Sequence, residues 1–210
     1  MSKKIKGKIN KVIRIMVFSD LVLNSGWGLV GPILAIYIAG TIKGGNVQVA
    51  GIAMGVYWLG KSIFQIPIAH YLDKNHGEKD DYYVLIGGTL LSSLTPIGFI
   101  FAVLPWHIYI LQGFHALGMA MAIPSWSAIF TRHIEKEREA FCWSLDSSAI
   151  GLGGGIAAIL GGTIAGFFGF TPLFIGVSIF GITASLLFLL IRKDLLPKVP
   201  KGRVFPMPKP

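Results

Sequence analysis

Two ionisable side chains stand inside long apolar stretches of the sequence, and they are the first candidates for chemistry. Asp20 follows an apolar run that begins at Val12, and Lys61 precedes the end of another at Leu72. A charge inside a lipid bilayer costs at least about 2.5–3.5 kcal/mol on insertion scales, so it needs a partner or a water-filled cavity. Side chains of this kind bind polar ligands, relay protons or pair with each other.

The positions of Asp20 and Lys61 allow the two charges to meet. Asp20 lies eight residues into its apolar run, about 12 Å along a helix, and Lys61 lies eleven residues before the end of its own, about 16 Å. Neighbouring antiparallel helices would bring them to similar depth. The pair would then fix helix register as a buried ion pair, or form a substrate or proton site. We favour the site, because Asn24 and Gln65 extend the same polar faces by one turn.

A later apolar stretch adds Gln112 and His115. Histidine titrates nearest physiological pH, so His115 can relay protons, although a lone histidine in a helical bundle is as often a hydrogen-bonded packing residue. Trp27, one turn from Asn24, is expected beside a ligand. Asp146 lies near the end of another stretch, where it is expected to face interfacial water or cap a neighbour. The candidate substrate or proton pathway is therefore Asp20, Asn24, Trp27, Lys61, Gln65, Gln112 and His115.

The elements that must position these side chains are membrane-spanning helices. Of the 210 residues, 53% are hydrophobic and 14% are charged, which leaves too little charge to cover a soluble surface. The apolar residues form six blocks, each with at least the roughly 20 residues that a helix needs to cross the hydrocarbon core. Their richness in Gly, Ala, Ile and Leu predicts an all-α integral membrane protein rather than a membrane β-barrel. The predicted spans are 12–38, 47–72, 83–104, 106–130, 140–167 and 172–191.

The basic residues predict how the chain is oriented. Of the 19 Lys and Arg residues, 17 fall on one side of the six spans; the opposite connections carry only Lys43, and Lys61 is intramembrane. This bias places both termini in the cytoplasm of a multi-pass cell-membrane protein, and it explains the net charge without nucleic-acid binding. The termini are a basic segment, 1–11, and a Pro- and Lys-rich tail, 194–210, that is expected to be disordered.

Several kinds of chemistry lack their residues. Cys142 is the only cysteine, so neither an intrachain disulfide nor a cysteine metal site is expected. The sequence has no Walker A loop and no His/Glu metal motif, which argues against ATP hydrolysis and metalloprotease activity. We therefore expect no enzyme activity, no cofactor and no metal.

Small residues give two further patterns. Gly26 and Gly118 are each followed six residues later by proline, in spans that run in opposite directions, as an inverted three-plus-three repeat predicts. The fifth span carries small residues at four-residue spacing, a pattern that lets another helix approach closely. This row either packs inside the bundle or forms a seam that moves or joins two protomers. The row is Gly154, Ala158, Gly162 and Gly166.

A charged hairpin between the second and third spans carries a family signature. The segment Ala69–Lys79 resembles the loop-2–3 motif of the major facilitator superfamily, Gly-x-x-x-Asp-Arg/Lys-x-Gly-Arg/Lys-Arg/Lys. The residues that match it are Asp73, Lys74, Gly77 and Lys79. Ala69 replaces the first glycine, one residue is inserted before Gly77, and Glu78 occupies a normally basic position.

Two further positions bear on the resemblance. The fifth span resembles the family's Gly-x-x-x-Gly-Pro-x-x-Gly-Gly motif, without its proline, from Gly153 through Ala157 and Ala158 to Gly161 and Gly162. The missing proline weakens any expectation of antiporter behaviour. In the fourth span, where the family often has an arginine linked to proton coupling, this chain has glutamine at 112.

The resemblance implies the N-terminal six-helix half of a twelve-helix secondary transporter, in which a small solute crosses between two halves. A chain with one half is then expected to pair with itself or with another six-helix half. In the family, the loop aspartate contacts a helix N-terminus of the other half, so Asp73 is expected to steady a gate by the helix dipole. The alternative is a non-transporting membrane module, either a degenerate half or an accessory subunit.

Overall fold

The computed structural model describes residues 9–74 and 77–195, and every regular element within these ranges is a helix. In chain order the helices are α1 (Lys11–Val30), η1 (Gly31–Ile33), α2 (Leu34–Thr41), α3 (Val47–Lys74), α4 (Glu78–Ile100), α5 (Pro105–His133), α6 (Glu139–Phe168), α7 (Phe170–Leu187), η2 (Phe188–Ile191) and α8 (Arg192–Leu195).

Six helical segments are long and apolar enough to cross a membrane, which confirms the predicted all-helical, six-span protein. The segments are Lys11–Thr41, Val47–Lys74, Glu78–Ile100, Pro105–His133, Glu139–Phe168 and Phe170–Leu195. The tail predicted to be disordered begins at residue 194, but Asp194 and Leu195 belong to helix α8, so the prediction is wrong for these two residues. The rest of the tail, 196–210, and the first eight residues of the basic segment lie outside the described residues.

Two helices begin earlier than the hydropathy pattern predicts. α4 begins at Glu78 rather than near residue 83, because three acidic side chains in its first turn suit the positive end of the helix dipole, and Gly77 precedes them in extended backbone. α5 begins at Pro105, which the sequence places in a connection. Proline fits the first position of a helix, because that residue has no intrahelical partner for an N–H group.

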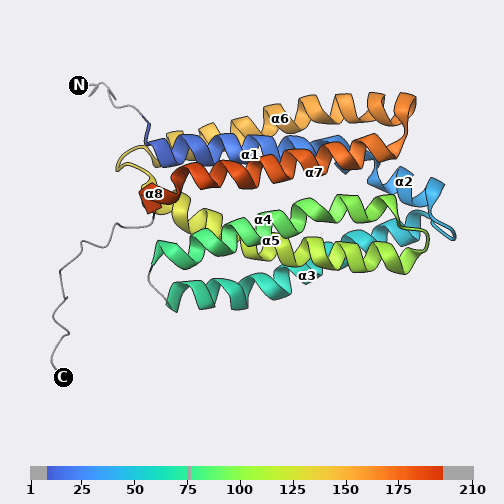
Figure 1. The fold of residues 1–210 in the computed structure, drawn as a ribbon, viewed down its shortest axis with the longest axis horizontal. Helices are drawn as coiled ribbons and strands as arrows, with labels where there is room; N and C mark the ends of the chain where they lie inside the picture. Colours follow the sequence, from blue (N-terminus) through green and yellow to red (C-terminus); the bar gives the residue numbers. More distant parts are fainter. Residues whose placement is uncertain (1–8, 75–76, 196–210) are drawn as a thin grey trace.

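The helices form two layers of three (Figure 1). One layer holds α1, α6 and α7, with α1 packed along both of the others, and the other holds α3, α4 and α5, with α5 in the central role. α4 and α7 make the main contact between the layers. These packing pairs map onto themselves when span 1 is exchanged with span 4, span 2 with span 5 and span 3 with span 6. The inverted repeat stays a prediction, which this pattern of contacts supports.

The two proline-containing spans differ in shape. The first span breaks into α1 and α2 at a short 3-10 turn that contains Pro32, whereas Pro124 lies inside continuous α5. Proline lacks the N–H that a helix needs and crowds the preceding turn, so a break is its usual effect. After the break, α2 packs on α3, and the Tyr37 hydroxyl donates a 2.5 Å hydrogen bond to the Phe99 carbonyl of α4.

Small residues let the packed helices approach closely. A Cβ added at Gly88 of α4 would lie 2.6 Å from the Gly118 carbonyl oxygen of α5, and one added at Gly118 would lie 2.7 Å from the Gly88 carbonyl oxygen. The two backbones are therefore in contact, which is the arrangement that small residues favour in membranes. Between α1 and α7, the Ser19 hydroxyl donates a 2.8 Å hydrogen bond to the Ala184 carbonyl.

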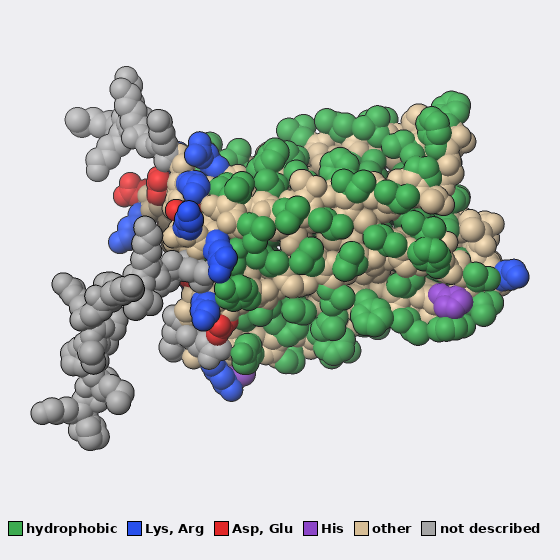
Figure 2. Space-filling view, in the orientation of Figure 1, with side chains coloured by type: hydrophobic (Ala, Val, Ile, Leu, Met, Phe, Trp, Pro, Cys, Tyr) green, Lys and Arg blue, Asp and Glu red, His purple; other side chains and the backbone are tan. Residues whose placement is uncertain are grey.

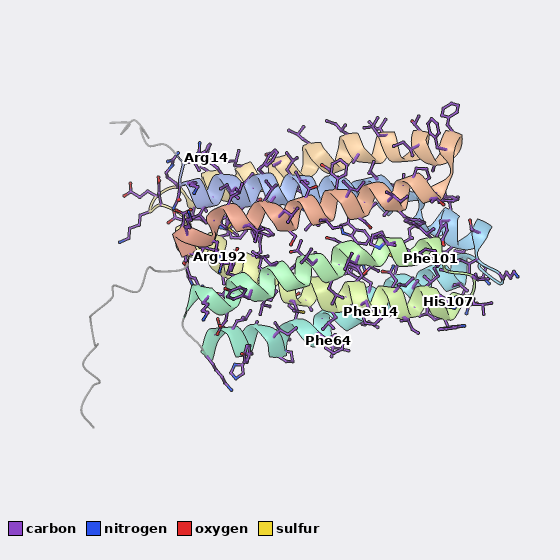
Figure 3. The ribbon with its side chains drawn as sticks, in the orientation of Figure 1. Arg14, Phe64, Phe101, His107, Phe114 and Arg192 are labelled. Atoms are coloured by element: carbon purple, nitrogen blue, oxygen red, sulfur yellow. The ribbon has the colours of Figure 1, made fainter. Side chains whose placement is uncertain are left out.

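Charged side chains gather at the end of the bundle where α1 begins and α8 lies, and the long middle of the visible face is apolar (Figure 2). Arg14 and Arg192 lie at the charged end, whereas Phe101 and His107 lie at the opposite end (Figure 3). At the charged end, Arg132 of α5 forms an ion pair with Asp81 of α4, whose side chain is 1% exposed. The first turn of α4 is thereby fixed to the last turn of α5.

Candidate functional site

Three stacked rings join α1, α3 and α5. The His115 ring stacks on Trp27 with 3.8 Å between centroids and an interplanar angle of 3°, and on Tyr57 with 4.4 Å and 22°. Two rings cannot stack on the same face of an imidazole, so His115 lies between Trp27 and Tyr57. The stack fixes the orientation of His115.

A cavity of about 220 Å³ adjoins this stack. Its polar lining is Asn24, Trp27, Tyr57, Gln112 and His115, and apolar side chains complete it. The helices bring these groups together because residues three positions apart project from one face, as Asn24 and Trp27 do on α1 and Gln112 and His115 do on α5. Four of the seven predicted pathway residues therefore line one cavity.

Several polar atoms of this cavity lack hydrogen bonds to protein. Among the described residues, Trp27 Nε1, Gln112 Oε1 and His115 Nδ1 are buried and have no such partner. Most buried polar atoms in proteins are paired, and one left unpaired costs about 1–3 kcal/mol. The three residues come from two helices and line one cavity, so they are candidates to bind a polar solute or water.

A second cavity of about 240 Å³ adjoins the first, and the two share Leu23 and Met119. Asp20 lines this second cavity rather than the first. Asp146 of α6 lines it too and is 5% exposed. The sequence placed Asp146 near interfacial water, but the contact of α6 with α1 brings it inside the bundle beside Asp20.

The structure does not bring Asp20 and Lys61 together. α1 packs on α6 and α7, while α3 packs mainly on α5, so the two helices are not the neighbours that the predicted pair needs. The ion pairs of the described residues do not include Asp20 with Lys61. The Lys61 ammonium instead lies over the Trp58 ring, 4.1 Å from its centroid, in a cation–π contact. Gln65 borders neither cavity.

The small residues of α6 fall on two faces. A Cβ added at Gly153 would meet Leu21 and Ser25 of α1, and one added at Gly161 would meet the Leu29 backbone. Together with buried Ala157, these glycines form the face that packs on α1.

The predicted row, one residue further along, behaves differently at each end. Gly154 lies near Gly28 of α1 and Ala158 is half-buried, but Gly162 and Gly166 are exposed with nothing within 4 Å of an added Cβ. For Gly162 and Gly166, packing inside the bundle is therefore the wrong interpretation. Residues 161 and 162 differ by about 100° around the helix, since a turn holds 3.6 residues.

The hairpin motif lies at the charged end. Asp73 and Lys74 are exposed at the end of α3, Gly77 precedes α4, and Lys79 is exposed in its first turn. Asn75 and His76 lie outside the described residues. Glu78, which departs from the family pattern, lies 3.4 Å from His133 of α5, so its carboxylate serves the contact between α4 and α5.

Two residues were missed by sequence reasoning, one in the ring stack of the candidate site and one in a buried ion pair. Tyr57 stacks on His115 and lies one helical turn before Lys61, which is the signal that could have indicated it. Asp81 is fully buried at an apparent helix end, and its sequence neighbours give no sign that Arg132 would reach it.

Comparisons with known proteins agree with this architecture. A family profile described as Major Facilitator Superfamily matches residues 16–208. An uncharacterized MFS-type transporter of Methanocaldococcus jannaschii is 25% identical over 90% of the chain and 48% of its own length. A multi-drug resistance efflux pump PmrA homolog of Lactococcus lactis is 27% identical over 87% of the chain and 44% of its own length.

Among solved structures, the POT family transporter PepTSo superposes with a TM-score of 0.71 at 16% identity, over 93% of this chain and 40% of that one. This likeness concerns the fold. The chain spans about half the length of the curated relatives it matches. With six membrane-spanning helices, the hairpin motif and a family match over nearly all of its length, the chain belongs to the Major Facilitator Superfamily.

Proposed function

We propose that this chain provides one six-helix half of a secondary active transporter for a small solute. The solute passes along the two adjoining cavities between α1 and α5. The observation that carries this proposal is the set of buried, unpaired polar atoms around the stacked His115 ring. A site built only for packing would pair these atoms or replace them with apolar groups, because each unpaired atom costs free energy.

The six helices need a second six-helix unit to complete the pathway. Neither cavity is enclosed by this chain alone, and a polar cavity open to lipid would leave its unpaired groups without water or partners. α3 and α6 lie at the outer edges of the two layers (Figure 1). In an apolar 18-residue stretch of each span, 17% of α3 and 11% of α6 is buried within the chain, against 39–44% for the other four spans. The second unit is a second copy of the chain or a different six-helix half.

The charged end is proposed to face the cytoplasm of the cell membrane. The positive-inside bias supports this orientation, since 17 of the 19 Lys and Arg residues belong to that side. Asp73 stands exposed there and no ion pair involves it within the described ranges. It is therefore available to dock on a helix N-terminus of the second unit. Lys61 and Gln65 stay predicted pathway residues, which a rearrangement of α3 would have to bring to the cavities.

The exchange of Gln112 for Leu tests the proposed pathway. We expect transport to be lost while the free energy of unfolding is unchanged or raised by about 1 kcal/mol, because an unpaired buried amide is replaced by an apolar group of similar size. Proteoliposomes would be assayed for uptake of a panel of neutral, anionic and cationic solutes under imposed ion gradients. Thermal unfolding of the same preparation would report stability.

The matched control is Gln48→Leu, because Gln48 is exposed near the start of α3 and borders neither cavity. It should retain uptake. A folded protein that moves none of the panel would contradict the transport proposal and favour a non-transporting membrane module. A Gln112→Leu variant that keeps uptake but loses stability would assign Gln112 to packing.

A further inference from the structure

We propose that the second cavity is a binding site for an organic ammonium ion, held between the carboxylates of Asp20 and Asp146 and the indole of Trp126. This inference deepens the proposed function, on which it rests for its biological sense, by naming the chemical class of the solute. The site lies between α1, α4, α5, α6 and η2, on the side of the first cavity that is nearer to the charged end.

The two carboxylates have no ion-pair partner among the residues that the structure describes. Asp146 is 5% exposed and its Oδ1 atom is buried without a hydrogen-bond partner among the described residues, while Asp20 is half-buried. Both residues line the same cavity. Within the described part of the chain, neither forms an ion pair with a Lys, Arg or His side chain. Acidic groups inside a membrane protein normally face a partner or a pathway, so a cationic ligand would supply the missing charge.

The rest of the lining selects an organic cation. Leu23, Leu85, Ile150 and Phe188 give the cavity apolar walls. Trp126 adds an indole ring, one face of which stacks on Phe130, and indole faces attract ammonium groups, quaternary ones included.

A hard metal ion would be held poorly by this lining. Such ions take about six or more oxygen ligands, and the side-chain oxygens of Asp20, Asp146, Thr89 and Ser127 reach six only if every one of them turns toward a single point. An amine with an apolar substituent matches both parts of the cavity, which has a volume of about 240 Å³.

Binding to the unmodified, full-length protein in detergent tests the inference directly. Isothermal titration with choline and with phenethylamine is compared with titration of dimethylbutanol, in which a neutral carbon replaces the choline nitrogen at nearly the same shape. We expect choline, phenethylamine or both to bind. If choline binds, it should bind more tightly than dimethylbutanol. Equal affinity for the matched pair together with no binding of phenethylamine would overturn the inference, and this arm needs no variant.

Variants then locate the site. Asp146→Asn and Asp20→Asn should each weaken binding of the cation by at least about thirtyfold, as expected for the loss of one member of a buried charge pair. Glu139→Gln, which removes an exposed charge at the start of the same helix as Asp146, should bind as the unmodified protein does. Unchanged affinity in both aspartate variants, with their thermal unfolding preserved, would place the cation elsewhere and overturn the assignment.

The outcome is separable from that of the proposed function, because binding in detergent requires no flux. A protein that moves neutral or anionic solutes in proteoliposomes but binds neither cation keeps the transport proposal and loses this inference. A protein that binds the cation at Asp20 and Asp146 but moves no solute keeps this inference and loses the transport proposal.

Discussion

Replacing Gly161 by Leu should destabilise the six-helix unit strongly. An added Cβ at this position would already overlap the Leu29 carbonyl of α1, and backbone cannot shift as the end of a flexible side chain can. Overpacking of this kind costs about 1–3 kcal/mol, and here we expect the upper end or more. The measurement is thermal unfolding of the purified protein in detergent, in which the midpoint should fall by several degrees.

The adjacent exchange, Gly162→Leu, is the matched comparison. Gly162 has open space around an added Cβ, and leucine is the better helix former, so the fold of the unit should be kept or slightly stabilised. If the second six-helix unit packs along this exposed part of α6, the same exchange should abolish pairing, measured by energy transfer between labelled units in liposomes. Two equally unfolded variants would contradict the assignment of the two faces, and undiminished pairing of Gly162→Leu would move the interface away from α6.

Replacing Arg132 by Leu should cost about 3 kcal/mol in the free energy of unfolding, because it leaves the carboxylate of Asp81 buried without its counter-charge. The Asp81 side chain is 1% exposed, while that of Arg132 is 39% exposed, which keeps our expectation at the lower end for a buried pair. Denaturation of the purified protein, read by circular dichroism, gives the free energy.

A double-mutant cycle separates the interaction free energy between Asp81 and Arg132 from the contribution of each side chain alone. Asp81→Leu combined with Arg132→Leu removes both charges, so the double variant should be more stable than Arg132→Leu alone. Lys136→Leu, a change at an exposed position in the same region, should have little effect. Additive effects of the two exchanges would mean that the ion pair contributes nothing to fixing α4 on α5.

The number and approximate position of the spans were predictable because hydropathy over about 20 residues is a local property of the sequence. The start of α4 was not, since the acidic residues from Glu78 read as a polar loop until they are placed at a helix N-terminus. The break at Pro32 and the continuity at Pro124 also differ despite similar local sequence. Whether the helix breaks at a proline depends on the neighbouring helix against which the following turn packs.

The candidate site could also be predicted only in part. Asn24, Trp27, Gln112 and His115 line one cavity, and their place in a solute pathway stays a prediction. The predicted pairing of Asp20 with Lys61 failed because it assumed that helices consecutive in sequence are neighbours in space. In the fold, α1 packs on α6 and α7, so Asp20 lies near Asp146.

The glycines of α6 illustrate a finer limit. A four-residue spacing predicts that a close-packed face exists, and Gly153 and Gly161 provide it. It does not predict which of two parallel rows meets α1, because the rows are related by one residue, or about 100° of rotation. That choice rests on the side chains of α1 that the helix meets.

The central claim, a water-accessible pathway between α1 and α5, is tested most directly by thiol labelling in native membranes. Cys142 is the only cysteine, so a Cys142→Ala background carries one introduced thiol at a time. Asn24→Cys, which borders the first cavity, should react with a membrane-impermeant maleimide. Phe114 lies on the outside of α5 and is 51% exposed (Figure 3). Phe114→Cys should not react, because it faces lipid. Labelling of Phe114→Cys alone, or of neither variant while both remain folded, would contradict the pathway.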